Sequence, residues 1–225
     1  KDNRTTWAYD ELQNIFQTNL PSIRDVVGDD IESAADDIVL YKCYRNPREI
    51  LVCAHALGFG IYSEGKIVQM LESQDRWESM GYEVQQGTFN LGDAMVISRP
   101  EENSLKSVSE AQSLDDIISA NSFESLTEEV RHVALKIQQD IQRGLRPDDI
   151  LVISLDNRHA KDYLAHITSE LSALGIASHN NHQDSYGVRD FEQEGMVTLS
   201  TINKAKGNEA YSVYALGVDA VHSAL

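Results

Sequence analysis

Two repeating patterns of apolar and polar positions run along this chain, and together they predict alternating strands and helices. Short apolar runs between polar or turn residues predict strands, at residues 5–9, 38–43, 83–86, 94–98, 149–154, 176–178, 196–200 and 211–217. Longer segments with apolar residues at helical spacing predict helices, at residues 48–57, 66–80, 125–144 and 158–174. The polar segment 10–37 is interpreted as helix and loop, and the segment 100–122 as a loop or a variable insertion.

The segment 125–154 has the clearest pattern. Ser125 and Glu128 have the spacing of a capping box, in which two side chains satisfy N–H groups at the start of a helix. Gly144 ends this helix, and the apolar positions before it share one helical face: Val130, Val133, Ala134, Ile137 and Ile141. The continuous apolar run 149–154 is typical of a strand covered on both faces. Strands that alternate with helices in this way predict an α/β fold built on a parallel sheet.

The composition is typical of a folded intracellular protein. Of the 225 residues, 41% are hydrophobic, which is enough for a buried core. No apolar run approaches the roughly 18 residues that a membrane span requires, and the first residues lack the apolar region of a secretion signal. Cys43 and Cys53 are the only cysteines. No disulfide framework is therefore expected, and the predicted location is a reducing cytoplasm.

The charge balance restricts the kind of nucleic-acid partner. The formal net charge is -17, which argues against a protein that coats nucleic acid, because phosphate contacts require clustered Lys and Arg. This charge does not exclude a motor that holds a single strand in a narrow groove.

The acidic segment after the first predicted strand is a candidate magnesium site. Asp10 and Glu11 follow the strand at 5–9 directly, and Gln13 comes two residues later. In a nucleotide hydrolase, the first acid at such a strand end holds Mg²⁺ and the second polarises the attacking water. The alternative is an acidic helix start, where the helix dipole stabilises carboxylates.

An arginine follows the second predicted strand, in the sequence Tyr44-Arg45-Asn46-Pro47. Arginine is always charged, and its planar fork fits phosphate oxygens. At a strand end, Arg45 can reach a γ-phosphate that is bound across a domain cleft. The alternative is a surface arginine paired with one of the chain's many acids.

The stretch 197–209, Val-Thr-Leu-Ser-Thr-Ile-Asn-Lys-Ala-Lys-Gly-Asn-Glu, runs from an apolar strand into a polar turn. Its hydroxyls and backbone N–H groups can meet a nucleic-acid phosphate, while Glu209 faces a nucleotide. The alternative is an ordinary strand and turn with solvated lysines.

Two other sets of residues are interpreted as structural. His179 and His182 resemble a metal-binding pair, but no further ligands cluster near them, and zinc needs three or four. A polar loop is expected there. Trp7, Trp77 and Phe89 can stack on bases, but they do not alternate with basic residues as in a nucleic-acid surface, so they are expected in the core.

Three of these segments occur in the order of motifs II, IV and V of superfamily I helicases. They are Asp10-Glu-Leu-Gln13, Tyr44-Arg-Asn-Pro47 and the stretch Thr198 to Glu209. The chain resembles helicases of the UvrD/Rep type, most of all those whose motif II reads Asp-Glu-x-Gln-Asn/Ser. The resemblance implies a parallel-sheet, RecA-like fold of the P-loop NTPase type. Residues 1–37 would be the end of a first RecA-like motor domain, and residues 38–225 a second one, incomplete at its C-terminus.

The resemblance also implies ATP and Mg²⁺ as cofactors. Asp10 would coordinate Mg²⁺, Glu11 would activate the attacking water, and Gln13 would sense the γ-phosphate. Arg45 would contact the γ-phosphate across the cleft.

The third motif implies contacts to both nucleotide and nucleic acid. Gly207 and Glu209 would lie near the nucleotide, with Glu209 reaching the ribose. Thr201, Asn203 and Lys204 would lie toward the nucleic acid, although the family often has histidine in place of Asn203. The expected partner is single-stranded DNA, with RNA as an alternative, and no membrane partner is expected. The oligomeric state is not predicted.

Two helicase motifs are missing from the sequence. No Gly-x-x-x-x-Gly-Lys-Ser/Thr segment occurs, and no arginine motif VI follows motif V. The chain is therefore interpreted as a fragment of an ATP-dependent DNA helicase, which couples ATP hydrolysis to translocation on single-stranded nucleic acid. The fragment alone is expected to be inactive. The alternative is a non-catalytic, helicase-like interaction module that kept the fold and lost turnover.

Overall fold

The computed structural model describes residues 40–61, 71, 73–90, 92–105, 113–182 and 190–222 of the chain. These residues belong to two compact units, one within Thr18–Ala120 and the other within Asn121–Leu225. Residues 1–37, which the sequence assigns to a first motor domain, lie outside the described residues. That domain division therefore stays a prediction.

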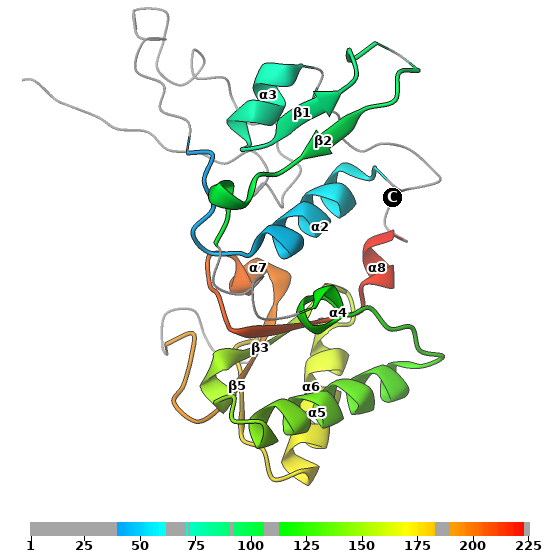
Figure 1. Cartoon of the computed structure of the whole chain (residues 1–225). Helices are drawn as coiled ribbons and strands as arrows, with labels where there is room; N and C mark the ends of the chain where they lie inside the picture. The colour runs from blue at the N-terminus through cyan, green and yellow to red at the C-terminus, as the bar shows by residue number, and fades with distance from the viewer. Residues whose placement is uncertain are drawn as a thin grey trace, which may run out of the picture. The chain divides into compact units, whose positions relative to one another are not determined.

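The C-terminal unit is a mixed α/β unit with a four-stranded sheet (Figure 1). Every pairing in this sheet is parallel, and the strand order is β4-β5-β3-β6. The strands are β3 (Ile150–Ser154), β4 (Ser178–Asn180), β5 (Val197–Thr201) and β6 (Ser212–Leu216). The helices are α5 (Leu126–Gln142), α6 (Ala160–Ala173), α7 (Ile202–Ala205) and α8 (Asp219–His222), with a 3-10 turn at Pro147–Asp149. The predicted α/β class with a parallel sheet is confirmed.

Helix α5 begins where the sequence predicts. The Ser125 side chain accepts a hydrogen bond from the Glu128 backbone N–H at 3.3 Å. The Glu128 carboxylate accepts from the N–H of Glu124, also at 3.3 Å. Only the serine half of the predicted capping box therefore forms as expected, because the glutamate binds one residue further upstream.

The main core lies between one face of the parallel sheet and the helices α5 and α6 (Figure 1). Ile137, Val152, Leu164 and Leu199 are completely buried in it. The other face of the central strands is buried as well, since Leu151 is 3% exposed and Thr198 1%. This burial on both faces confirms the interpretation of the apolar run 149–154.

The N-terminal unit has a different architecture. Its two strands, β1 (Glu83–Gln86) and β2 (Val96–Ser98), pair with each other in antiparallel fashion, with an irregularity between Val84 and Gln86. They do not join the parallel sheet. The helices are α2 (Arg48–Phe59), α3 (Gln74–Ser79) and α4 (Leu114–Ile117), with a 3-10 turn at Glu101–Asn103. In its described residues, the predicted loop at 100–122 thus contains two short helical elements.

One predicted strand and the starts of two other predicted elements are wrong, for identifiable reasons. Residues 40–43 are not a strand, because single bonds to the segment 99–104 hold their backbone instead of a ladder. The helix predicted at 66–80 begins only at Gln74, after Ser73 in extended conformation. Strand β4 starts two residues late, because the Ile176 N–H donates to Leu171 O at the end of α6.

Aromatic rings form the small core of the N-terminal unit. Trp77 is 4% exposed, and its ring meets those of Phe59 and Tyr82 edge-on at 5.6 and 5.5 Å between centroids. The Trp77 indole N–H donates to Leu71 O at 3.1 Å, and Phe89 packs partly buried against the same cluster. The core interpretation of Trp77 and Phe89 is confirmed, whereas Trp7 lies outside the described residues.

No helix within the described part of the chain is long and apolar enough to cross a membrane. Cys43 and Cys53 are both free thiols.

Gly81 is expected to be essential for the N-terminal unit. Its φ is 84°, and a Cβ added there would lie 2.5 Å from Tyr41 O and 2.8 Å from Arg99 Nη1. Gly81→Ala therefore combines backbone strain with a clash against backbone, and we expect a loss of about 2–4 kcal/mol in the free energy of unfolding. Gly92→Ala is the matched control, since Gly92 has φ 93° and no atom within 4 Å of an added Cβ. Urea unfolding of both variants measures the difference, and equal losses would contradict the clash.

Candidate functional site

The stretch 197–209 leaves the centre of the parallel sheet at the carboxyl end of β5. Thr201, the last residue of β5, is 6% exposed and pairs in register with Ser154 of β3. The one-turn helix α7 follows immediately, and Gly207 then turns the chain with φ 90°. Gly207 and Glu209 are exposed, and a Cβ added to Gly207 would have no atom within 4 Å. This turn therefore leaves room for a ligand to approach the backbone closely.

The sheet topology makes the carboxyl ends of β3 and β5 a candidate binding edge. From β3 the chain passes through α6 to β4, on the far side of β5. From β5 it passes through α7 in the opposite direction, to β6 on the far side of β3. Figure 1 shows α6 and α7 on opposite sides of the sheet. In open parallel sheets, ligands bind outside the carboxyl ends of strands where connections depart in opposite directions.

Two side-chain contacts connect the loops at this edge. Asn203 Nδ2, in α7, donates to Asn157 Oδ1 after β3 at 3.5 Å. Lys204 Nζ donates to the backbone oxygen of Asn181, just after β4, at 2.6 Å. The ends of three neighbouring strands thus contribute to one polar surface.

The loop after β3 is held in shape by Asp156. One carboxylate oxygen accepts from the backbone N–H groups of Arg158 and His159 at 2.9 and 3.2 Å, and the other contacts His159 Nδ1 at 2.7 Å. Burial acts to raise the pKa of Asp156, but the hydrogen bonds from His159 and Arg158 outweigh it, so the pKa lies below its ordinary value. A charged Asp156 therefore fixes the loop and leaves Asn157 and Arg158 exposed.

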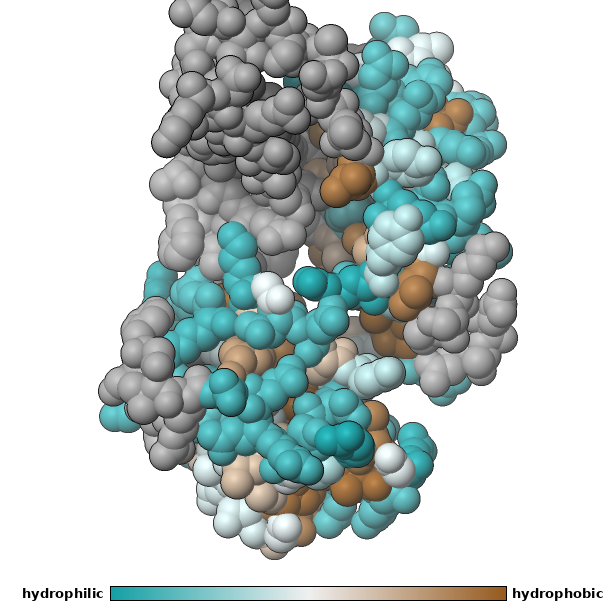
Figure 2. Space-filling view, turned by 90° about the vertical axis from the view of Figure 1, so that its left-hand side faces the viewer, coloured by the Kyte–Doolittle hydropathy of each residue, from teal (hydrophilic) through white to brown (hydrophobic). Residues whose placement is uncertain are grey.

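Sequence reasoning missed Asn157 and Arg158. The available signal was their place directly after a buried apolar run, where the carboxyl end of a parallel strand brings polar residues to the sheet edge. Figure 2 shows that hydrophilic side chains cover most of the described surface on one face of the molecule. Exposed polar residues alone therefore do not distinguish a site, and the meeting of the two loops was needed to single these residues out.

Arg45 lies in the N-terminal unit, in the bend between Cys43 and Pro47 that precedes α2. Its side chain is exposed. The three acidic-motif residues, Asp10, Glu11 and Gln13, lie outside the described residues. The structure therefore brings Thr201, Asn203 and Lys204 together with the loops after β3 and β4, and it locates Gly207 and Glu209 on the adjoining turn. It does not relate them to Arg45 or to the acidic motif.

His179 lies within β4 and His182 lies two residues after it. His179 is 5% exposed, and its register partner on β5 is Thr198, whereas His182 is exposed. Across the described ranges, no three His, Cys, Asp or Glu side chains gather closely enough to hold a metal ion. The polar loop expected at His179 is therefore wrong, because His179 lies buried in β4, whereas His182 lies exposed in the turn after the strand.

Comparisons with known proteins add no family assignment. No family model matches the chain, and neither the curated proteins nor the solved structures contain a match to it.

Proposed function

We propose that this chain is part of an ATP-dependent superfamily I helicase, and that its C-terminal unit belongs to a RecA-like motor domain. The observation that carries the proposal is the location of the helicase-like stretch 197–209. It begins on a central strand of an all-parallel sheet and continues, through α7 and the Gly207 turn, along the carboxyl edge. Polar residues from neighbouring strands meet it there, at the edge where open parallel sheets bind their ligands.

In this proposal the β3–β5 edge contacts the nucleic-acid backbone. Asn157 and Asn203 offer amide donors to phosphate or sugar oxygens, and the exposed Arg158 offers a guanidinium. These contacts are few, and the net charge of -17 opposes the approach of a polyanion. Binding is therefore expected to weaken steeply as salt rises.

The nucleotide contacts of the proposal come from several parts of the chain. The open space around Gly207 fits a close approach of the nucleotide to the backbone, with Glu209 nearby for the ribose. The exposed Arg45 has the fork that suits a γ-phosphate. By the resemblance, Asp10 holds Mg²⁺, Glu11 orients the attacking water and Gln13 senses the γ-phosphate. When bound, Mg²⁺ neutralises charge on the phosphate oxygens.

The experiment is ATP hydrolysis by the full-length protein with and without single-stranded DNA. We expect hydrolysis that requires Mg²⁺ and rises on addition of the strand, because a motor couples turnover to its track. Glu11→Gln removes the base that orients water, and it is expected to lower the rate by at least about a hundredfold. Glu192→Gln, at an exposed position of the C-terminal unit, is the control.

A wild-type protein that binds nucleic acid and never hydrolyses ATP would contradict the proposal. That result would favour an interaction module that kept the fold and lost turnover.

A further inference from the structure

Arg99 donates four hydrogen bonds within the described part of the N-terminal unit. It is 5% exposed. Its Nε donates to Ser104 Oγ at 2.8 Å, and its Nη2 donates to Tyr41 O at 2.9 Å and to Asn103 O at 2.6 Å. Its Nη1 donates to Met80 O. These four acceptors come from three separate segments of the chain, and all of them are neutral.

Burying a guanidinium against neutral acceptors costs free energy. The presence of an arginine here therefore indicates that its geometry is needed. Burial lowers the pKa of Arg99, while the Tyr82 ring 5.3 Å away acts in the opposite direction. An apolar residue would fill the same space with a smaller desolvation penalty. The planar fork of arginine, in contrast, fixes several acceptors in set directions at once. The contribution of Arg99 is therefore geometric: it sets the relative positions of three backbone segments.

One of these segments leads directly into the bend that carries Arg45. Arg99 holds the carbonyl of Tyr41, and the N–H of Cys43 donates to Asn103 O at 3.0 Å. That same Asn103 oxygen also accepts from Arg99. The chain is thus attached to the Arg99–Asn103 segment at two points within four residues of Arg45.

The bend is closed and attached on its other side as well. The N–H of Asn46 donates to Cys43 Sγ at 3.4 Å. Pro47 then forms an isolated parallel β-bridge with Leu105. Arg45 therefore lies on a short bend between two attachments, and both attachments lead to the segment that begins at Arg99.

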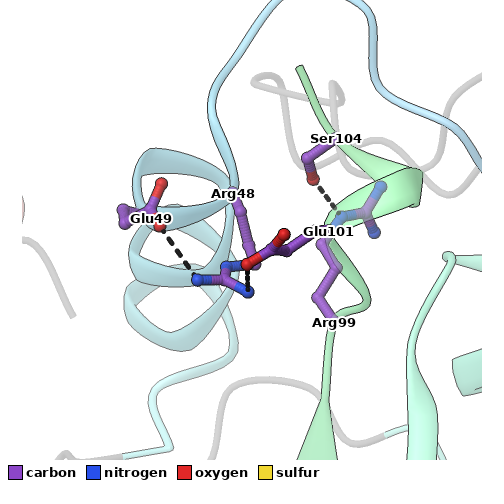
Figure 3. A network of polar contacts seen from close by, with 5 residues as sticks. All are labelled: Arg48, Glu49, Arg99, Glu101 and Ser104. Carbon is purple, nitrogen blue, oxygen red and sulfur yellow. Dashed lines mark hydrogen bonds and ion pairs between the residues drawn. The ribbon is translucent and has the colours of Figure 1, made fainter. Parts of the chain in front are cut away.

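A second arginine beside the bend makes a weaker connection. Figure 3 shows Arg48 between Glu49 of its own helix and Glu101, while Arg99 reaches Ser104. The Arg48–Glu101 pair is 3.5 Å long and exposed. Exposed pairs of this kind contribute little, so the buried fork of Arg99 is the stronger constraint.

We propose that Arg99 is a positioning residue for Arg45: it fixes the backbone of residues 41–47 and thereby aims the Arg45 guanidinium at the γ-phosphate. This inference rests on the proposed function, because it requires that Arg45 acts on a nucleotide. The fixed bend keeps the backbone at Arg45 ordered before ATP arrives, so less entropy is lost when the transition state forms.

The test uses Arg99→Lys in the full-length protein. Lysine keeps the positive charge but cannot hold Tyr41 O, Met80 O and Ser104 Oγ together. Hydrogen exchange in residues 41–47, read at the Cys43 N–H, is expected to become at least about tenfold faster, because the backbone opens more often. The kcat for ATP is expected to fall about tenfold with KM within about twofold, since the lost contact acts in the transition state.

A double variant separates positioning from simple destabilisation. If Arg99 acts through Arg45, Arg45→Ala with Arg99→Lys hydrolyses ATP no more slowly than Arg45→Ala alone. Arg76→Lys, the same substitution at an exposed position of α3, is the control and leaves exchange at Cys43 unchanged. Should Arg99→Lys fail to fold, Ser104→Ala removes only the acceptor of Nε and is expected to accelerate exchange at the same N–H.

Two results would overturn the inference. One is wild-type exchange at Cys43 in both Arg99→Lys and Ser104→Ala. The other is a double variant whose loss of kcat equals the product of the two single losses. Failure of the proposed function gives a different result, because Arg45→Ala then hydrolyses ATP at the normal rate. Hydrogen exchange at the Cys43 N–H still reports whether Arg99 holds the bend.

Discussion

Arg45→Ala is expected to lower the kcat of strand-stimulated ATP hydrolysis by at least about tenfold, because in the proposed function it removes a charge that faces the γ-phosphate during transfer. Arginines in this role contribute about 10³ to 10⁵ in rate in other nucleotide hydrolases. The Arg45 side chain is exposed on a bend, outside both hydrophobic cores. Its removal is therefore expected to change the free energy of unfolding by no more than about 0.5 kcal/mol.

The measurement is ATPase activity of the full-length protein in saturating single-stranded DNA, alongside thermal unfolding. Arg45→Lys is the informative companion variant. It is expected to recover only part of the rate, because a point charge does not reproduce the planar fork. Normal turnover in the alanine variant would remove Arg45 from the catalytic machinery.

Leu164→Ala is expected to destabilise the C-terminal unit by about 2–5 kcal/mol, the range observed when a buried leucine is truncated. Leu164 lies in α6 with no exposed surface, and it belongs to the cluster that includes Ile137, Val152 and Leu199. Its truncation leaves a cavity between α5, α6 and the sheet. Because the same sheet supports the β3–β5 edge, the variant is also expected, under the proposed function, to lose nucleic-acid binding at temperatures where the unit unfolds.

Leu135→Ala is the matched control, since it removes the same atoms from a leucine of α5 that is 41% exposed. A loss below about 1 kcal/mol is expected there. Urea unfolding followed by circular dichroism compares the two variants. Equal midpoints for both would mean that the described core does not carry the stability of this unit.

Local signals in the sequence were sufficient for the helix α5 and the strand β3. Apolar residues recur at helical spacing between Ser125 and Gly144. Four of the five predicted apolar positions are buried, and the fifth, Ile141, is partly exposed and packs against the same core. The run at 149–154 is apolar without alternation, as a strand buried on both faces requires. In both cases the residues that decide the structure are neighbours along the chain.

The order of strands was not predictable in the same way. Strand β5 inserts between β3 and β4, and β1 pairs with β2 outside the parallel sheet. Nothing local in the sequence specifies these partners, since any apolar strand can pair with several others. The helix predicted at 66–80 does not run through Leu71 and Ser73 for a related reason, because its apolar residues also suit the aromatic cluster that contains Leu71 and Trp77.

The candidate site shows the same limit. The apolar strand before Thr201 predicted that the polar turn would emerge at a strand end, and the structure has it there. The bonds of Asn203 to Asn157 and of Lys204 to Asn181 join residues 46 and 23 positions apart. Such contacts depend on the sheet order, so sequence patterns alone did not reveal them.

The central claim is that the full-length protein moves along a single strand as it hydrolyses ATP. The most direct measurement is displacement of streptavidin from oligonucleotides that carry biotin at one end or the other. Rapid displacement from one of the two ends is expected with ATP, and none with a non-hydrolysable analogue or with Glu11→Gln. Stable binding to the oligonucleotide without ATP-dependent displacement from either end would contradict it.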